Sequence, residues 1–83
     1  MDDKTNERIL KKINTLISQE QMTIRDGDNY VKRKRPKNGF TACEIYNDLK
    51  LGISERDTFI ILNSMVMLHG RLKIKDLTYF LVR

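Results

Sequence analysis

Residues 41–70 decide the fold, and they read TACEIYNDLKLGISERDTFIILNSMVMLHG. Thr41 and Glu44 have the spacing of a capping box, in which each side chain hydrogen-bonds to the backbone N–H of the other residue at a helix start. We therefore expect a helix over residues 42–51.

A tight turn and another helix follow directly. Gly52 can take the left-handed conformation that ends a helix, and Ser54 is a typical helix-start residue. This later helix is expected to continue to His69, where Gly70 ends it. Apolar side chains fill about half of its circumference, so it should lie at the centre of the core; they are Phe59, Ile61, Leu62, Met65, Val66 and Leu68.

Upstream of this stretch, the sequence predicts one helix and a less regular segment. Between residues 4 and 19, apolar residues recur at helical spacing, at Ile9, Leu10, Ile13, Leu16 and Ile17. Residues 22–25 alternate between apolar and polar side chains, residues 26–29 are typical of a turn, and residues 30–35 can form an extended segment again. We therefore expect a short strand or an irregular hairpin in this part of the chain. Pro36 lacks a backbone N–H donor, and Asn38-Gly39 is a turn dipeptide, so this segment should end as exposed backbone.

Downstream, residues 71–75 alternate between basic and apolar side chains, and residues 78–82 are rich in strand formers. Asp76-Leu77 lies between them, which predicts a C-terminal β-hairpin. The fold class is therefore α+β, and the order helix, strand, helix, tight turn, helix, hairpin is that of a winged helix-turn-helix domain. The alternative is a three-helix bundle with an independent C-terminal segment.

The chain has 83 residues, which is enough for one domain over residues 1–83. No apolar run approaches the length of a membrane-spanning helix. The single cysteine cannot form an internal disulfide, and residues 1–4 lack the layout of a secretory signal. We expect a cytoplasmic protein that does not enter a membrane.

The net charge of +5 is concentrated in one segment. Residues 1–29 carry five positive and six negative side chains, and residues 40–83 carry six and five, so they nearly cancel. Residues 30–39 carry five cations and no acid, namely Lys32, Arg33, Lys34, Arg35 and Lys37. Such a run is often only a solvated loop, but next to Tyr30 it can also bind phosphates and stack an unpaired base.

A second group of cations strengthens the nucleic-acid interpretation. If Leu72 and Ile74 face the core, then Arg71, Lys73 and Lys75 share the outer face of one strand. The helix expected after residue 54 is poorly suited to duplex reading, because acidic residues occupy its first turn and its outward row includes Ile60 and Met67. These features favour binding of single-stranded DNA with weak sequence preference.

Catalysis is not expected. His69 is the one histidine and is placed to cap a helix end, and Cys43 has no basic partner close in sequence. We found no metal-ligand spacing, phosphate-binding loop or nucleophile motif, so no cofactor is expected. Tyr46 is interpreted as a core residue. Ile60 and Met67 either form a partner surface or lie beneath the C-terminal hairpin.

The chain resembles the small winged-helix single-stranded-DNA-binding proteins of staphylococcal cassette chromosome elements. The resemblance rests on the order of the elements, the basic run Lys32 to Lys37, and residues 41–70 with their turn at Gly52-Ile53-Ser54. It implies a non-catalytic role in the replication or transfer of a mobile genetic element. The acidic first turn of the last helix departs from winged helices that bind duplex DNA.

The sequence therefore predicts a single-stranded DNA-binding protein. Its predicted contact residues are Tyr30, Lys32, Arg33, Lys34, Arg35, Lys37, Arg71, Lys73 and Lys75. If about five phosphates are neutralised, the logarithm of affinity should fall with the logarithm of salt concentration at a slope of roughly −3.5. Two alternatives remain: a duplex-binding regulator that uses Arg56, Asn63 and Ser64, and an adaptor whose Ile60 and Met67 surface docks a helicase or recombinase.

Overall fold

The computed structural model describes residues 3–82, which form a small α+β domain of three helices and antiparallel strands. The predicted domain limits, residues 1 and 83, lie outside the described residues. The elements in chain order are α1 (Asp3–Leu16), β1 (Gln21–Asp26), β2 (Asn29–Lys34), β3 (Gly39–Thr41), α2 (Ala42–Tyr46), α3 (Glu55–Met67), β4 (Leu72–Lys75) and β5 (Thr78–Leu81).

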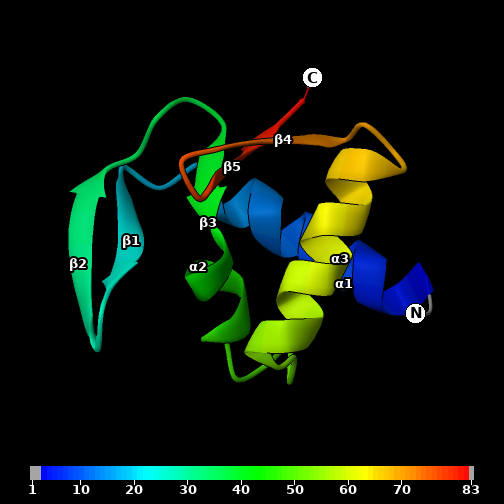
Figure 1. The fold of residues 1–83 in the computed structure, drawn as a ribbon, viewed down its shortest axis with the longest axis horizontal. Coiled ribbons are helices and arrows are strands. Elements are labelled where there is room, and N and C mark those ends of the chain that lie inside the picture. Colours follow the sequence, from blue (N-terminus) through cyan, green and yellow to red (C-terminus); the bar gives the residue numbers. More distant parts are fainter. Residues whose placement is uncertain (1–2, 83) are drawn as a thin grey trace.

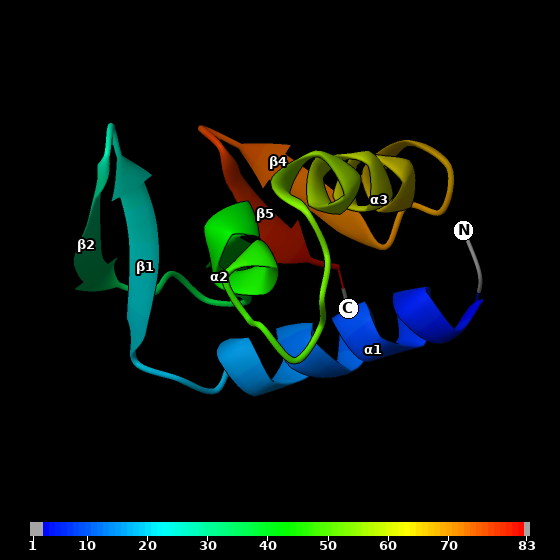
Figure 2. The ribbon, with the colours of Figure 1, turned by 90° about the horizontal axis from the view of Figure 1, so that it is seen from below.

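The strands form two separate sheets. β1 and β2 make a two-stranded hairpin, and β3, β5 and β4 make a three-stranded sheet in that order. Figure 1 shows the β1–β2 hairpin standing beside the body, and Figure 2 shows α1 crossing beneath α2 and α3. The order thus differs from the predicted one, because a regular hairpin precedes β3.

The sequence predicted a turn and exposed backbone immediately before α2, and the presence of β3 shows that this prediction was wrong. Its three residues are all buried, and Gly39, Phe40 and Thr41 pair with Phe80, Tyr79 and Thr78 of β5. Propensity in so short a segment is weak, and its pairing partner lies far along the chain.

The core lies where α1, α2 and α3 meet the inner face of the three-stranded sheet. Its buried members are Ile9, Ile13, Leu16, Phe40, Ala42, Ile45, Ile61, Leu62, Met65, Leu72 and Tyr79. The rings of Phe40 and Tyr79 stack with centroids 5.8 Å apart. The alternative of a three-helix bundle with an independent C-terminal segment is wrong, because β5 pairs with β3 and both C-terminal strands contribute to the core.

The helix signals explain the body of the fold, although the helices are shorter than predicted. The Thr41 backbone N–H donates to Glu44 Oε1 at 3.1 Å, as expected for a capping box. The Ser54 hydroxyl accepts from the Asp57 backbone N–H at 3.1 Å and starts α3. Gly52 has a φ of +60°, the left-handed conformation predicted for it.

Candidate nucleic-acid interface

The first three cations of the basic run, Lys32, Arg33 and Lys34, lie in β2, and Arg35 and Lys37 lie in the loop that follows it. Residues 29–34 pair with residues 21–26, so successive side chains of β2 point to opposite faces of the hairpin. Lys32 shares its face with Thr23 and donates to the Thr23 hydroxyl at 2.6 Å, whereas Arg33 lies on the other face, opposite Met22. The cations are therefore distributed over several surfaces.

Tyr30 and Lys32 lie at an open groove between the hairpin and the helices. The groove has a volume of about 650 Å³, and Lys12, Asp48 and Lys50 line its other side. Lys12 Nζ lies 3.0 Å from Asp48 Oδ2. Hydrogen bonds from the Lys12 ammonium and the Lys50 backbone lower the pKa of the Asp48 carboxyl. The groove thus contains both signs of charge, and Tyr30 is half exposed beside it.

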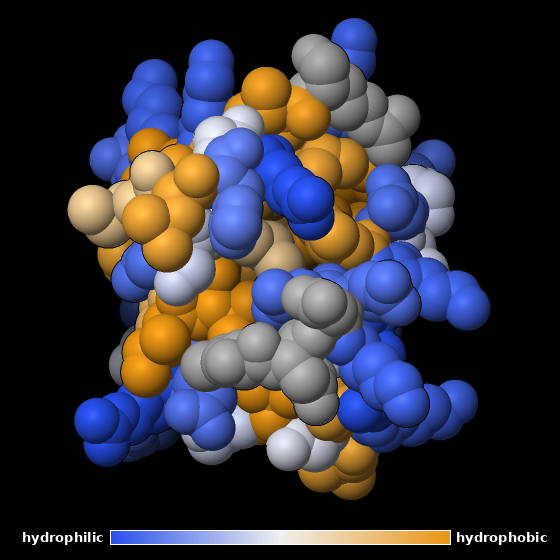
Figure 3. All heavy atoms as spheres, turned by 90° about the vertical axis from the view of Figure 1, so that its right-hand side faces the viewer, coloured by the Kyte–Doolittle hydropathy of each residue, from blue (hydrophilic) through white to orange (hydrophobic). Residues whose placement is uncertain are grey.

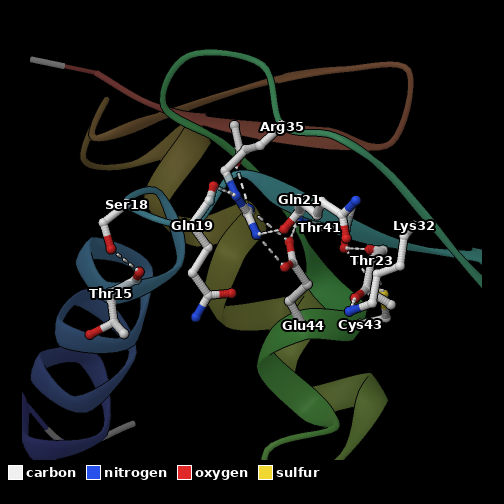
Figure 4. A network of polar contacts seen from close by, with 11 residues as sticks. Thr15, Ser18, Gln19, Gln21, Thr23, Lys32, Arg35, Thr41, Cys43 and Glu44 are labelled. Atoms are coloured by element: carbon white, nitrogen blue, oxygen red, sulfur yellow. Dashed lines mark hydrogen bonds and ion pairs between the residues drawn. The ribbon is translucent and has the colours of Figure 1, made fainter.

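Arg35 is buried, which corrects the prediction that it belongs to an exposed binding strip. Its Nη1 and Nη2 atoms donate to Glu44 Oε1 at 3.0 Å and to Oε2 at 2.6 Å (Figure 4). The guanidinium also donates to the carbonyls of Gln19, Gln21 and Gly39. A guanidinium has five N–H groups, and all five are used within the protein, so Arg35 has no donor left for a phosphate.

Lys34 and Lys37 are exposed and lie on either side of this buried arginine. Together with Pro36 they line a cavity of about 550 Å³, in which Glu20 is the one acidic side chain. Pro36 lies directly over β3, because a Cβ placed on Gly39 would stand 2.6 Å from its Cγ. The loop of residues 35–38 arches over the sheet at the top of Figure 1.

Lys73 and Lys75 lie on the outer face of β4, as the alternation predicts. Leu72 points into the core, and the lysines at alternate positions are exposed. Ile74 is a correction, because its side chain is 45% exposed and does not enter the core. Arg71 precedes β4 and is exposed.

Phe80 is the residue that sequence reasoning missed. It lies in β5 directly between Gly39 of β3 and Lys73 of β4, so its ring shares the outer face with the β4 lysines. A Cβ on Gly39 would also stand 3.2 Å from Phe80 Cε1, which places the ring beside Pro36. Consecutive residues of a strand point to opposite faces, so Phe80 faces away from the core that buries Tyr79; the three apolar residues Tyr79, Phe80 and Leu81 do not show from sequence which of them face inward.

We call six residues the outer face. Phe80 shares one face of the three-stranded sheet with Lys73 and Lys75. Pro36 lies beside the Phe80 ring, and Lys34 and Lys37 line a cavity together with Pro36. Phe80 is partly exposed and the four lysines are exposed. Within residues 3–82, the ion pairs join Lys12 to Asp48, Arg25 to Glu55 and Arg35 to Glu44, so none involves these lysines. The outer face thus combines an aromatic ring with lysines of β4 and lysines on either side of Pro36 in the chain.

The outward side of α3 carries few groups for reading base edges. Asn63 Oδ1 accepts from the Tyr79 hydroxyl at 2.8 Å, and the Ser64 hydroxyl donates to the Ile60 carbonyl at 2.9 Å. Ile60 and Met67 are exposed, so the alternative that the C-terminal hairpin covers them is wrong. Figure 3 shows apolar side chains gathered over α3 on this side of the molecule.

The other candidate residues occupy ordinary structural positions. Cys43 is buried, and its Sγ lies 3.2 Å from the Thr23 carbonyl oxygen. His69 lies beyond the end of α3 and is exposed. Tyr46 is partly buried and packs against the core. Residues 3–82 contain no group of histidine, cysteine and acidic side chains arranged to hold a metal ion, and none of their helices has the length and apolar character needed to cross a membrane.

Comparison with protein-family models, curated proteins and solved structures found no match to this chain. The functional argument therefore depends on its own residues.

Proposed function

We propose that this protein is a non-catalytic single-stranded DNA-binding protein and that the outer face is its main contact surface. The observation that carries the proposal is the position of Phe80, which lies beside Lys73 on the sheet and beside Pro36, the residue next to Lys37 in the chain. The lysines bind successive phosphates, while the ring stacks against a base. Tyr30, Lys32, Arg33 and Arg71 are proposed to extend this contact.

A single strand suits this surface better than a duplex. An unpaired base has a free face that can lie on an aromatic ring, whereas the bases of a duplex are already stacked on each other. A duplex-reading helix needs free polar side chains near its N-terminus. α3 instead begins with Glu55 and Asp57, and the side-chain oxygens of Asn63 and Ser64 are engaged within the protein.

We further propose that the domain is a winged helix with an additional hairpin. If β1–β2 is treated as an insertion, the remaining order is α1, β3, α2, α3, β4, β5. This is the order of element types in a winged helix, although the sequence placed the first strand within residues 22–35 and not at β3. The pairing of β3 with β5 and of β5 with β4 supports this assignment. A role in the replication or transfer of a mobile genetic element is part of the same proposal and rests on the family resemblance.

A second candidate function is that of an adaptor for a helicase or recombinase. It is favoured by the exposure of Ile60 and Met67 on α3. The two functions separate in one variant, because Ile60→Asp should abolish an adaptor complex while single-stranded DNA binding stays unchanged.

The test of the main proposal compares single- and double-stranded oligonucleotides of equal length by fluorescence anisotropy. Wild type should bind the single strand more tightly, and Lys73/Lys75→Ala should weaken that binding. The matched control is Lys4/Lys11→Ala, which removes two exposed lysines from α1 and should bind like wild type. Equal loss in both double variants, or a preference for the duplex, would contradict the proposal.

A further inference from the structure

A separate pocket lies between the turns of the two hairpins, and none of the outer-face residues lines it. It has a volume of about 340 Å³, and Gly27 of the β1–β2 turn and Leu77 of the β4–β5 turn stand at its borders. Figure 2 shows both turns on one side of the molecule, with α2 below them in that view. The apolar part of the lining comes from Ile24, Ala42, Cys43, Tyr46, Phe59 and Leu77.

The backbone conformation and the exposure of Leu77 are both unfavourable for a leucine in the isolated domain. Asp76 and Leu77 have φ values of +50° and +64°, in a turn where asparagine and glycine are preferred. A bulky residue rarely adopts a positive φ. The Leu77 side chain is also 82% exposed, so it gains little from packing within the domain. Neither the backbone conformation of Leu77 nor its packing within the domain accounts for a leucine at this position.

The rim of the pocket is acidic. Asp26 and Asp28 flank Gly27, and Asp76 precedes Leu77; all three are exposed, and none has an ion-pair partner within residues 3–82. Glu55 also lines the pocket, where its Oε1 accepts from Arg25 Nη1 at 2.9 Å. These four carboxylates outnumber the three cations beside them in the chain, which are Arg25, Arg56 and Lys75. The small negative excess favours cations over phosphate.

We propose that this pocket binds a cationic segment of a partner protein, anchored by an apolar side chain between the two turns. The apolar lining accepts the anchor, and lysine or arginine residues on either side of the anchor meet the carboxylates of the rim. This surface is distinct from the outer face, so the protein can hold single-stranded DNA and a partner together. The inference does not depend on the DNA-binding proposal.

The experiment uses isotope-labelled full-length protein and three short synthetic peptides, with binding followed by NMR chemical shifts. The first peptide has a central leucine between lysines, the second replaces the lysines by glutamates, and the third replaces the leucine by glycine. We expect the first peptide to shift the signals of Gly27, Thr41 and Leu77 in a salt-dependent manner. The glutamate peptide and the glycine peptide should each bind at least tenfold more weakly than the first. The glutamate peptide loses the attraction between opposite charges, and the glycine peptide loses the burial of one leucine side chain.

Leu77→Asn is the decisive variant, because asparagine tolerates a positive φ and the fold should be no less stable. It should weaken binding of the first peptide about tenfold. Leu49→Asn is the matched control, since Leu49 is 93% exposed and lies outside the pocket, and this variant should bind the peptide like wild type.

Four results would overturn the proposal. They are the absence of shifts at the pocket, equal binding of the lysine and glutamate peptides, wild-type affinity in Leu77→Asn, and a protein that self-associates through this pocket. The last result would identify the occupant as a second copy of the chain. Unchanged single-stranded DNA binding in Leu77→Asn is expected in every case, which keeps this test separate from that of the outer face.

Discussion

Arg35 and Glu44 form a buried, two-pronged ion pair in which both oxygens of the carboxylate accept from the guanidinium, at 2.6 and 3.0 Å. Their side chains are only 2% and 5% exposed. The same guanidinium holds carbonyls from the segment that leads into β1 and from β3. The pair therefore fastens the β1–β2 hairpin to the start of α2, and the most buried cation of the basic run is structural.

Arg35→Ala should destabilise the fold by about 3–5 kcal/mol, because it leaves the Glu44 carboxylate buried and unpaired. Urea denaturation measures this loss. Arg35→Lys should recover little of it, since an ammonium cannot reproduce the planar set of five donors. The control is Arg33→Ala, an exposed neighbour whose loss should change the free energy of unfolding by no more than about 0.5 kcal/mol. A stable Arg35→Ala variant with weakened DNA binding would show that Arg35 contacts DNA.

Phe80→Leu should weaken single-stranded DNA binding by about tenfold or more, because base stacking on an aromatic ring contributes about 1–3 kcal/mol. Leucine keeps the apolar contact with Pro36 but has no aromatic face. Phe80→Tyr keeps that face and should bind like wild type. Anisotropy titrations at one salt concentration measure both variants, and wild-type affinity in Phe80→Leu would remove the stacking role.

Tyr79→Phe should lower stability by about 1 kcal/mol at neutral pH, because the hydrogen bond to Asn63 is lost. Burial raises the pKa of the Tyr79 hydroxyl above its ordinary value of 10.0. Above that pH the unfolded chain releases a proton that the folded protein retains, so the free energy of unfolding falls as pH rises. Tyr79→Phe should therefore lose stability less steeply than wild type between neutral pH and about pH 11. Parallel pH curves for the two proteins would be inconsistent with this assignment.

The sequence predicted those elements whose signals are local. Ser54 marks a helix start by its own chemistry, and the strand formers around Asp76-Leu77 mark the C-terminal hairpin. Gly52 takes the predicted left-handed conformation, but the helix before it already ends at Tyr46. β3 was missed because its three residues become a strand only by pairing with β5. That pairing depends on the tertiary structure and leaves no local signal in the sequence.

The candidate site was predicted only in part, for a similar reason. A run of cations indicates a basic segment, but it does not show which of its side chains is buried. Arg35 is buried because it forms an ion pair with Glu44 in the first turn of α2. Phe80 was missed because strand formers alone do not distinguish the inner from the outer face of β5. Lys73 and Lys75 were placed correctly on the outer side of β4 because Leu72 anchors the alternation.

The salt dependence of single-stranded DNA affinity tests the central claim most directly. At about 0.7 per phosphate, the four lysines of the outer face should contribute about −2.8 to the logarithmic slope, and phosphates bound by Lys32, Arg33 and Arg71 should make it steeper. Lys73/Lys75→Ala should make the slope shallower by about 1.4. A slope near zero in wild type, or an unchanged slope in the double variant, would contradict the proposal that these lysines bind the phosphates.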